Sequence, residues 1–210
     1  MFLSESDRDR IIRTAAELCA EVGYEEMLVE RVAERANVSA EHFRELFDGK
    51  EAVVRSAVDA ILAAVVALVG ELYEPDRPEP ESYLLTIKAI LELMADNPEF
   101  ALISYVGARQ MMPPELKQQL DSGSGLLTAM LERLSPYSRA DVQPSRAGRA
   151  ALGGAEAVVR QEVTLGRAAN LPWLLPDFFY AATVPFLGQQ EALRLARRGR
   201  ELLVGPTGGS

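Results

Sequence analysis

The side chains best suited to chemistry lie in one short stretch, from Ser39 to Lys50, which also contains His42 and Arg44. Hydroxyl, imidazole, guanidinium and ammonium groups hydrogen-bond to base edges and neutralise phosphates, and this binding needs no covalent step. The sequence contains one His and one Cys, too few for a soft-ligand metal site, and it has no glycine-rich phosphate loop and no nucleophile motif. We therefore expect a binding protein rather than an enzyme, with no metal ion and no cofactor.

Two short helices must position these side chains, and the apolar spacing predicts them over residues 29–36 and 40–47. Asn37 tolerates the left-handed conformation that a tight turn needs, and Ser39 is a good N-cap for the second helix. Phe43, Leu46 and Phe47 share one face of that helix. Two short helices joined by such a turn form a helix-turn-helix, whose second helix enters the major groove of DNA. Its outer face then carries Ala40, Glu41, His42, Arg44 and Glu45.

The rest of the chain has a helical pattern, so the fold class is all-α with about nine to ten helices. Besides the two short helices, the pattern predicts helices over 8–22, 50–72, 82–95, 97–110, 114–134, 145–169, 174–184 and 189–199. Proline-containing segments separate most of the later ones. We expect a helix-turn-helix domain over residues 1–49, a larger helical domain over 50–204 and a flexible tail over 205–210.

The net charge of −9 counts against nonspecific binding to nucleic acid. The first 55 residues hold 8 basic and 13 acidic side chains, so the predicted DNA-binding domain itself carries about −5. Repulsion from the duplex weakens binding and sharpens its dependence on salt. The alternative is therefore a helical protein-interaction module whose helix-turn-helix is a relict that no longer binds DNA.

Residues 8–58 resemble the TetR family of bacterial regulators. The resemblance is most specific over 32–39, which reads Val-Ala-Glu-Arg-Ala-Asn-Val-Ser, and over 43–51, which reads Phe-Arg-Glu-Leu-Phe-Asp-Gly-Lys-Glu. It implies a homodimer that binds a palindromic operator as a repressor and is released by a ligand in the C-terminal domain. By position, the resemblance assigns DNA contacts to Ser39, Ala40, Glu41, His42, Arg44 and Glu45, and a phosphate contact to Lys50.

The sequence departs from the family pattern at several positions. Met27 and Leu28 stand where the family usually has a Ser or Thr that caps the first short helix. Asn37 replaces a common Gly, Glu41 stands where Gly or Ala is common, and Arg44 replaces a Tyr that bonds a phosphate. A guanidinium binds phosphate as well, so Arg44 keeps the expected role.

Large, adaptable side chains in the C-terminal region are candidates for an effector site that takes a small apolar or amphipathic molecule. They are Phe100, Tyr105, Arg109, Met112, Met130 and Trp173. Small residues in the predicted helix 145–169 permit close helix contact, and an aromatic helix follows it. We expect the dimer interface there, through Gly154, Val158, Phe178 and Phe179, although a contact between two helices of one chain fits the same pattern.

His42 lies near Glu41 and Glu45, whose carboxylates favour the charged imidazole. Bound DNA favours that form further, so we expect operator affinity to rise as pH falls.

Residues 1–13 are charged and lack the apolar core of a signal peptide, and the longest uncharged stretches are shorter than the ~20 residues that span a bilayer. These features predict a cytoplasmic protein that does not bind a membrane.

Overall fold

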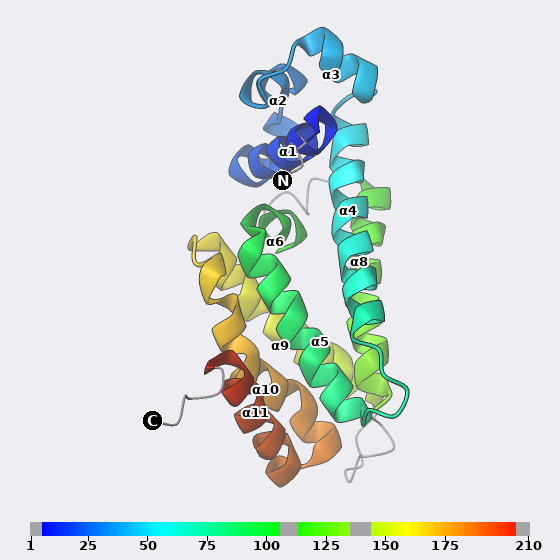
Figure 1. Cartoon of the computed structure of the whole chain (residues 1–210), viewed down its shortest axis with the longest axis vertical. Coiled ribbons are helices and arrows are strands. Elements are labelled where there is room, and N and C mark those ends of the chain that lie inside the picture. Colours follow the sequence, from blue (N-terminus) through cyan, green and yellow to red (C-terminus); the bar gives the residue numbers. More distant parts are fainter. Residues whose placement is uncertain (1–5, 106–112, 135–143, 205–210) are drawn as a thin grey trace, which may run out of the picture. The chain divides into compact units, whose positions relative to one another are not determined.

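The computed structural model describes residues 6–105, 113–134 and 144–204, and these are helical with short connections (Figure 1). The predicted all-α class is confirmed. Arg109, Met112 and the predicted tail lie outside the described residues. The elements are α1 (Asp7–Glu26), α2 (Val29–Arg35), α3 (Ala40–Leu46), α4 (Lys50–Glu71), α5 (Glu79–Asp96), α6 (Pro98–Tyr105), α8 (Pro114–Glu132), α9 (Pro144–Thr164), the 3₁₀ helix η2 (Ala168–Leu174), α10 (Leu175–Leu187) and α11 (Gln189–Val204).

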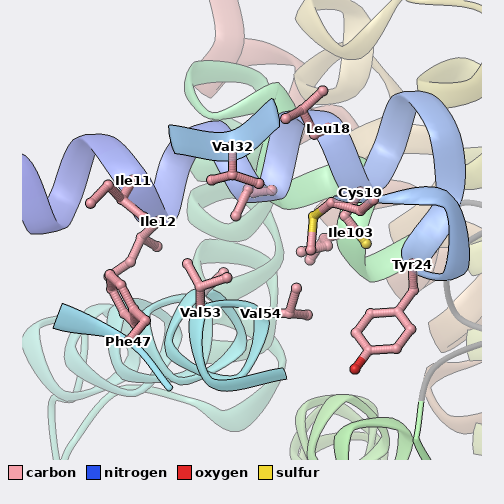
Figure 2. Close-up of a cluster of buried hydrophobic side chains, with 14 of the residues drawn as sticks. Ile11, Ile12, Leu18, Cys19, Tyr24, Val32, Phe47, Val53, Val54 and Ile103 are labelled. Carbon is pink, nitrogen blue, oxygen red and sulfur yellow. The ribbon is translucent and has the colours of Figure 1, made fainter. Parts of the chain in front are cut away.

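The chain divides into two compact units, residues 1–64 with 98–121 and residues 65–97 with 122–210. The first unit holds α1, α2 and α3 around one buried hydrophobic cluster (Figure 2). The start of α4 contributes Val53, Val54, Ala57 and Val58 to this cluster, each with no exposed surface. Ile103 of α6, a helix that packs against α1, is buried in the same cluster. The helix-turn-helix therefore draws its core from residues well beyond position 49.

Helix α1 begins at a capped N-terminus and changes direction at a glycine. The Ser6 hydroxyl accepts a hydrogen bond from the backbone N–H of Asp9 at 3.1 Å. At Gly23 the backbone has φ 84° and ψ 161°, which ends the regular helix where the sequence predicts its end, and one further turn continues to Glu26. Met27 fills the corner with 1% of its surface exposed, and the N-terminus of α2 has no side-chain cap, as its sequence predicts.

The turn between α2 and α3 has the predicted local geometry. Asn37 has φ 54°. The N–H of Val38 donates to the carbonyl of Ala33 at 3.0 Å, which closes the turn. The Ser39 hydroxyl accepts from the N–H of His42 at 3.0 Å and caps α3. The start and direction of α3 are therefore set by its own sequence.

In the second unit α10 and α11 pack against each other, and α5 packs against η2, α10 and α11. Helix α11 continues past the predicted end at residue 199 and ends at Val204, so Gly199 lies within the helix. A Cβ atom there would lie 3.2 Å from Leu84 Cδ1 and 3.3 Å from Leu175 Cδ2. The glycine permits close contact between helices in the middle of α11.

The predicted single helix over 145–169 is wrong in its last part. Helix α9 ends at Thr164, Gly166 has φ 70°, and the 3₁₀ helix η2 follows. The Arg167 guanidinium pairs with the Glu162 carboxylate and stabilises this break. The small-residue helix therefore does not reach the segment that precedes α10.

By length and composition alone, α4 is apolar enough to cross a membrane. Its first half contributes to the buried cluster described above, whereas only 28% of its most apolar 18-residue window is buried. Cys19 is buried in the same cluster, where burial raises the pKa of its thiol to about 12. The thiol is therefore a small core group, as its apolar neighbours predict.

Candidate nucleic-acid interface

Helix α3 turns its aromatic residues inward and its polar residues outward, as its sequence predicts. Phe43 has no exposed surface, Phe47 has 4%, and their ring centroids lie 5.6 Å apart. These rings anchor α3 on the buried cluster. The predicted DNA-facing residues all retain exposed surface, with Ser39, Glu41, Arg44 and Glu45 the most open and Ala40 and His42 partly buried.

Arg44 extends into solvent with 63% of its side chain exposed. Its guanidinium lies 3.6 Å from the Glu30 carboxylate of α2, at the outer limit of an ion pair. Such a loose, exposed pair contributes little to stability. The guanidinium can therefore exchange this carboxylate for a phosphate at small cost.

Lys50 has a role within the fold that its sequence position does not indicate. Its ammonium donates to the backbone carbonyls of Tyr24 at 3.1 Å and Glu25 at 3.0 Å. It also lies 4.7 Å from the centroid of the Tyr24 ring, within the range of a cation–π contact. Lys50 thus binds the last turn of α1, where carbonyls lack helical partners. Two of the three N–H donors of the Lys50 ammonium therefore already hydrogen-bond within the protein in the absence of DNA.

His42 lies between two carboxylates. Its Nδ1 is 2.9 Å from Glu45 Oε2, and its Nε2 is 3.1 Å from Asp7 Oδ2 at the start of α1. The contacts with Glu45 and then Asp7 raise the pKa of His42 above its ordinary value. The expected influence of Glu45 is confirmed, whereas the second carboxylate is Asp7 and not Glu41.

The first turn of α1 supplies charged residues to this surface that the sequence alone does not assign to it. The Arg8 guanidinium lies 5.2 Å from the Phe47 ring centroid and donates to the Ser56 hydroxyl at 3.3 Å. Arg10 pairs with Asp7 and donates through Nε to the carbonyl of Ala36 at 2.7 Å. The sequence signal for these residues is a charged first turn of a helix. Such a turn is also found on helices where the charges only cap the N-terminus, so it does not by itself indicate a DNA contact.

The predicted effector residues that the structure describes are divided between the two units. Phe100 and Tyr105 are half-buried in the first unit, and Phe100 packs against the buried cluster. Met130 is half-buried in the second unit, and Trp173 of η2 is 59% exposed. A tryptophan this exposed does not line an enclosed cavity. Among the described residues, no group of three His, Cys, Asp or Glu side chains is placed to hold a metal ion.

The predicted interface residues have different environments in the single chain. Phe179 has no exposed surface, and its ring lies 5.9 Å from that of Tyr83, so it belongs to the core and not to a surface. Phe178 is half-buried, whereas Val158 is 46% exposed and Gly154 has open space beside it. An open groove of about 1100 Å³ also runs along α10 and α11, lined in part by Tyr180, Leu193, Arg197 and Val204.

Comparison with known proteins bears on the helix-turn-helix and on the fold separately. Residues 11–57 match the family model of bacterial regulatory proteins of the tetR family. A comparison with curated proteins finds no significant sequence match. Among solved structures, the chain is similar to the fatty acid degradation regulator FadR from Bacillus halodurans, with a TM-score of 0.71 and 18% identity, over 88% of this chain and 97% of that one.

Two further structures have the same fold. The transcriptional regulator FadR from Bacillus subtilis, in complex with stearoyl-CoA, aligns with a TM-score of 0.66 and 19% identity, over 85% of this chain and 97% of that one. The TetR family transcriptional regulator PfmR from Thermus thermophilus aligns with a TM-score of 0.58 and 25% identity, over 78% of this chain and 96% of that one. Residues 11–57, which run from α1 into α4, thus match the tetR family of bacterial regulatory proteins, and the chain shares its helical fold with solved transcriptional regulators.

Proposed function

We propose that this protein is a cytoplasmic, ligand-responsive repressor that binds a palindromic operator as a homodimer. The observation that carries the proposal is α3, a capped helix anchored by buried Phe43 and Phe47, with an open polar outer face. This face lies within the segment that matches the family model. A helix held in this way presents its side chains to the major groove.

Selection of bound duplexes from a random DNA pool tests the proposal even though the operator sequence is unknown. The full chain is used, and the recovered sequences are aligned. A dimer with two recognition helices enriches a palindrome whose half-sites are about 10–10.5 base pairs apart, or a multiple of this spacing. A recovered pool that stays random contradicts operator binding.

For the effector we propose an apolar or amphipathic molecule bound by the larger helical domain. The support is the likeness in fold to the FadR protein of Bacillus subtilis, which was crystallised with stearoyl-CoA. Stearoyl-CoA and stearate are therefore the first probes, with coenzyme A as the control that lacks the acyl chain. Binding raises the melting temperature and lowers affinity for the selected duplex, with a coupling of ~1–3 kcal/mol between the sites. A melting temperature unchanged by both probes contradicts an acyl effector.

One observation favours the alternative of a relict helix-turn-helix. Both cations on the outer face of α3 have carboxylate partners, Arg44 with Glu30 and His42 with Asp7 and Glu45. A phosphate would therefore have to compete with these carboxylates for the same cations. The alternative predicts that the chain binds selected and scrambled duplexes with the same affinity.

A further inference from the structure

The His42 ring joins two helices of the DNA-binding domain. Its two nitrogens face Glu45 on α3 and Asp7 on α1, at 2.9 Å and 3.1 Å. A neutral imidazole has one N–H donor, whereas an imidazolium has two. Only the protonated ring can therefore donate to both carboxylates, and the neutral ring must leave one carboxylate facing a lone pair. The two-sided contact belongs to the charged form.

The contact continues beyond His42 to the turn that precedes α3. Asp7 also accepts from Arg10, whose Nε donates to the carbonyl of Ala36. The Arg10 guanidinium holds the pKa of Asp7 below its ordinary value, so this carboxylate stays ionised. The first turn of α1 is thereby linked both to the α2–α3 turn and to the outer face of α3.

The charged groups that face the ring come from two helices. They are Asp7 from α1, with Arg10 behind it, and Glu45 from α3. On α2, which also packs against α3, Glu30 pairs with Arg44, and Arg35 pairs with Glu17 and Glu21 of α1. With His42 protonated, the group of Asp7, Arg10, His42 and Glu45 is neutral. Loss of the proton leaves it with one negative charge.

We propose that His42 is a positioning residue. In its protonated form it joins the recognition helix α3 to α1, through Glu45 and Asp7, in the orientation that binds DNA. We call this two-sided contact the clip. This inference rests on the proposed DNA-binding function. Deprotonation breaks one side of the clip and adds a negative charge to a surface that meets phosphates. Both changes lower affinity for DNA. The residue acts through Asp7 and Glu45, and it needs no contact with a base.

The sign of the pH dependence follows from the direction of the His42 shift. The pKa of His42 lies above its ordinary value of 6.5, so the clip is complete below that pH and is lost as pH rises through the higher value. DNA binding favours the clipped form and raises the pKa further. Affinity then falls with increasing pH from the pKa of the free protein upward, by at most about tenfold for each unit of pKa difference between bound and free forms.

Nuclear magnetic resonance tests the clip without any DNA. His42 is the only histidine, so its ring signals need no assignment. The wild-type ring is expected to titrate above 6.5, and Asp7→Asn to lower its pKa. Asp9→Asn is the matched control, because it removes an equal charge from the same turn of α1 without touching the ring. A wild-type pKa at or below 6.5, or equal values in Asp7→Asn and Asp9→Asn, would overturn the clip.

Affinity for a selected duplex, measured from about pH 6 to pH 9 to span the histidine titration, then tests positioning. In the wild type and in Asp9→Asn, affinity is expected to fall from the ring pKa measured for each free protein. In Asp7→Asn the fall should begin at a lower pH, by the same shift as its ring pKa. Superimposed profiles for the two variants would overturn the positioning role. If no duplex binds at any pH, the proposed function fails, and the positioning role with it, whereas the ring titration still decides whether the clip exists.

Discussion

At the scale of single residues, Lys50 holds together the end of α1 and the start of α4. Its ammonium binds two carbonyls of α1 and the face of Tyr24. Charge-assisted hydrogen bonds of this kind contribute more than neutral ones. A residue predicted to bind phosphate therefore also stabilises the fold. Unfolding without DNA measures the second role, and DNA affinity measures the first.

Lys50→Met is expected to lower the free energy of unfolding by about 1–2 kcal/mol, because it keeps the aliphatic stem and removes the donors. Urea unfolding of the protein without DNA measures this loss. Arg55→Met is the control, since Arg55 makes an exposed pair with Glu51 one turn away, worth about 0.3–0.5 kcal/mol. Equal losses in the two variants would show that the Lys50 contacts do not stabilise the fold.

Tyr83 has a buried hydroxyl with no hydrogen-bond partner among the described residues. Burial of the ring also raises the pKa of this hydroxyl. An unpaired buried hydroxyl costs ~1–3 kcal/mol, so Tyr83→Phe is expected to raise the free energy of unfolding by up to that amount. Tyr73→Phe, at a residue that is 66% exposed, should leave stability unchanged. A Tyr83→Phe protein less stable than wild type would mean that the hydroxyl has a partner.

At the scale of elements, the outer face of α3 carries cations that acidic neighbours already hold. A phosphate competes with Glu30 for the Arg44 guanidinium. Because each phosphate contact releases counterions, the number of contacts appears in the dependence of affinity on salt. The dependence of DNA affinity on salt therefore reports on the phosphate contacts of this surface even when the bound sequence is unknown.

Arg44→Ala is expected to weaken binding about equally for all duplexes and to reduce the slope of log affinity against log salt by about one. Glu30→Gln should strengthen binding, because it frees the same guanidinium. Fluorescence anisotropy at several salt concentrations gives both slopes. A loss in Arg44→Ala that is confined to one base position would instead assign Arg44 to reading that base.

The sequence predicted the elements that rest on local signals. Asn37 and Ser39 define the turn before α3, and the spacing of Phe43 and Phe47 defines its inner face. The contact between Asp7 and His42 was not predicted, because the two residues are 35 positions apart and polar surface residues carry no periodic pattern. The end of α9 was not predicted either, because a single glycine such as Gly166 is a weaker signal than the apolar periodicity around it.

At the scale of the whole molecule, the proposed operator requires two copies of the chain. Phe179 lies in the core of one chain and so cannot form the predicted interface. Besides the exposed surface of α9 that carries Gly154 and Val158, we propose the groove along α10 and α11 as the surface for a second copy. Leu193 is 40% exposed in this groove, and Val204 is 56% exposed. Apolar side chains in a hollow surface favour association because their burial removes them from water.

Leu193→Glu is therefore expected to convert the protein to a monomer, because it places a charge in the proposed interface. Sedimentation velocity at micromolar concentration measures the change. Val158→Glu, on the exposed face of α9, is the matched variant and should remain dimeric. The opposite result would move the interface to α9, and a monomeric wild-type protein would contradict the dimer altogether.

We propose above all that this acidic helix-turn-helix reads a DNA sequence. Its most direct test is the ratio of affinities for the selected duplex and for a scrambled duplex of the same composition, measured by fluorescence anisotropy at physiological salt. The charge of about −5 weakens nonspecific binding, and we expect base contacts from the outer face of α3 to provide the specificity. We predict a ratio of at least about 10³, as for specific DNA-binding proteins. A ratio near one would contradict the account and identify the helix-turn-helix as a relict.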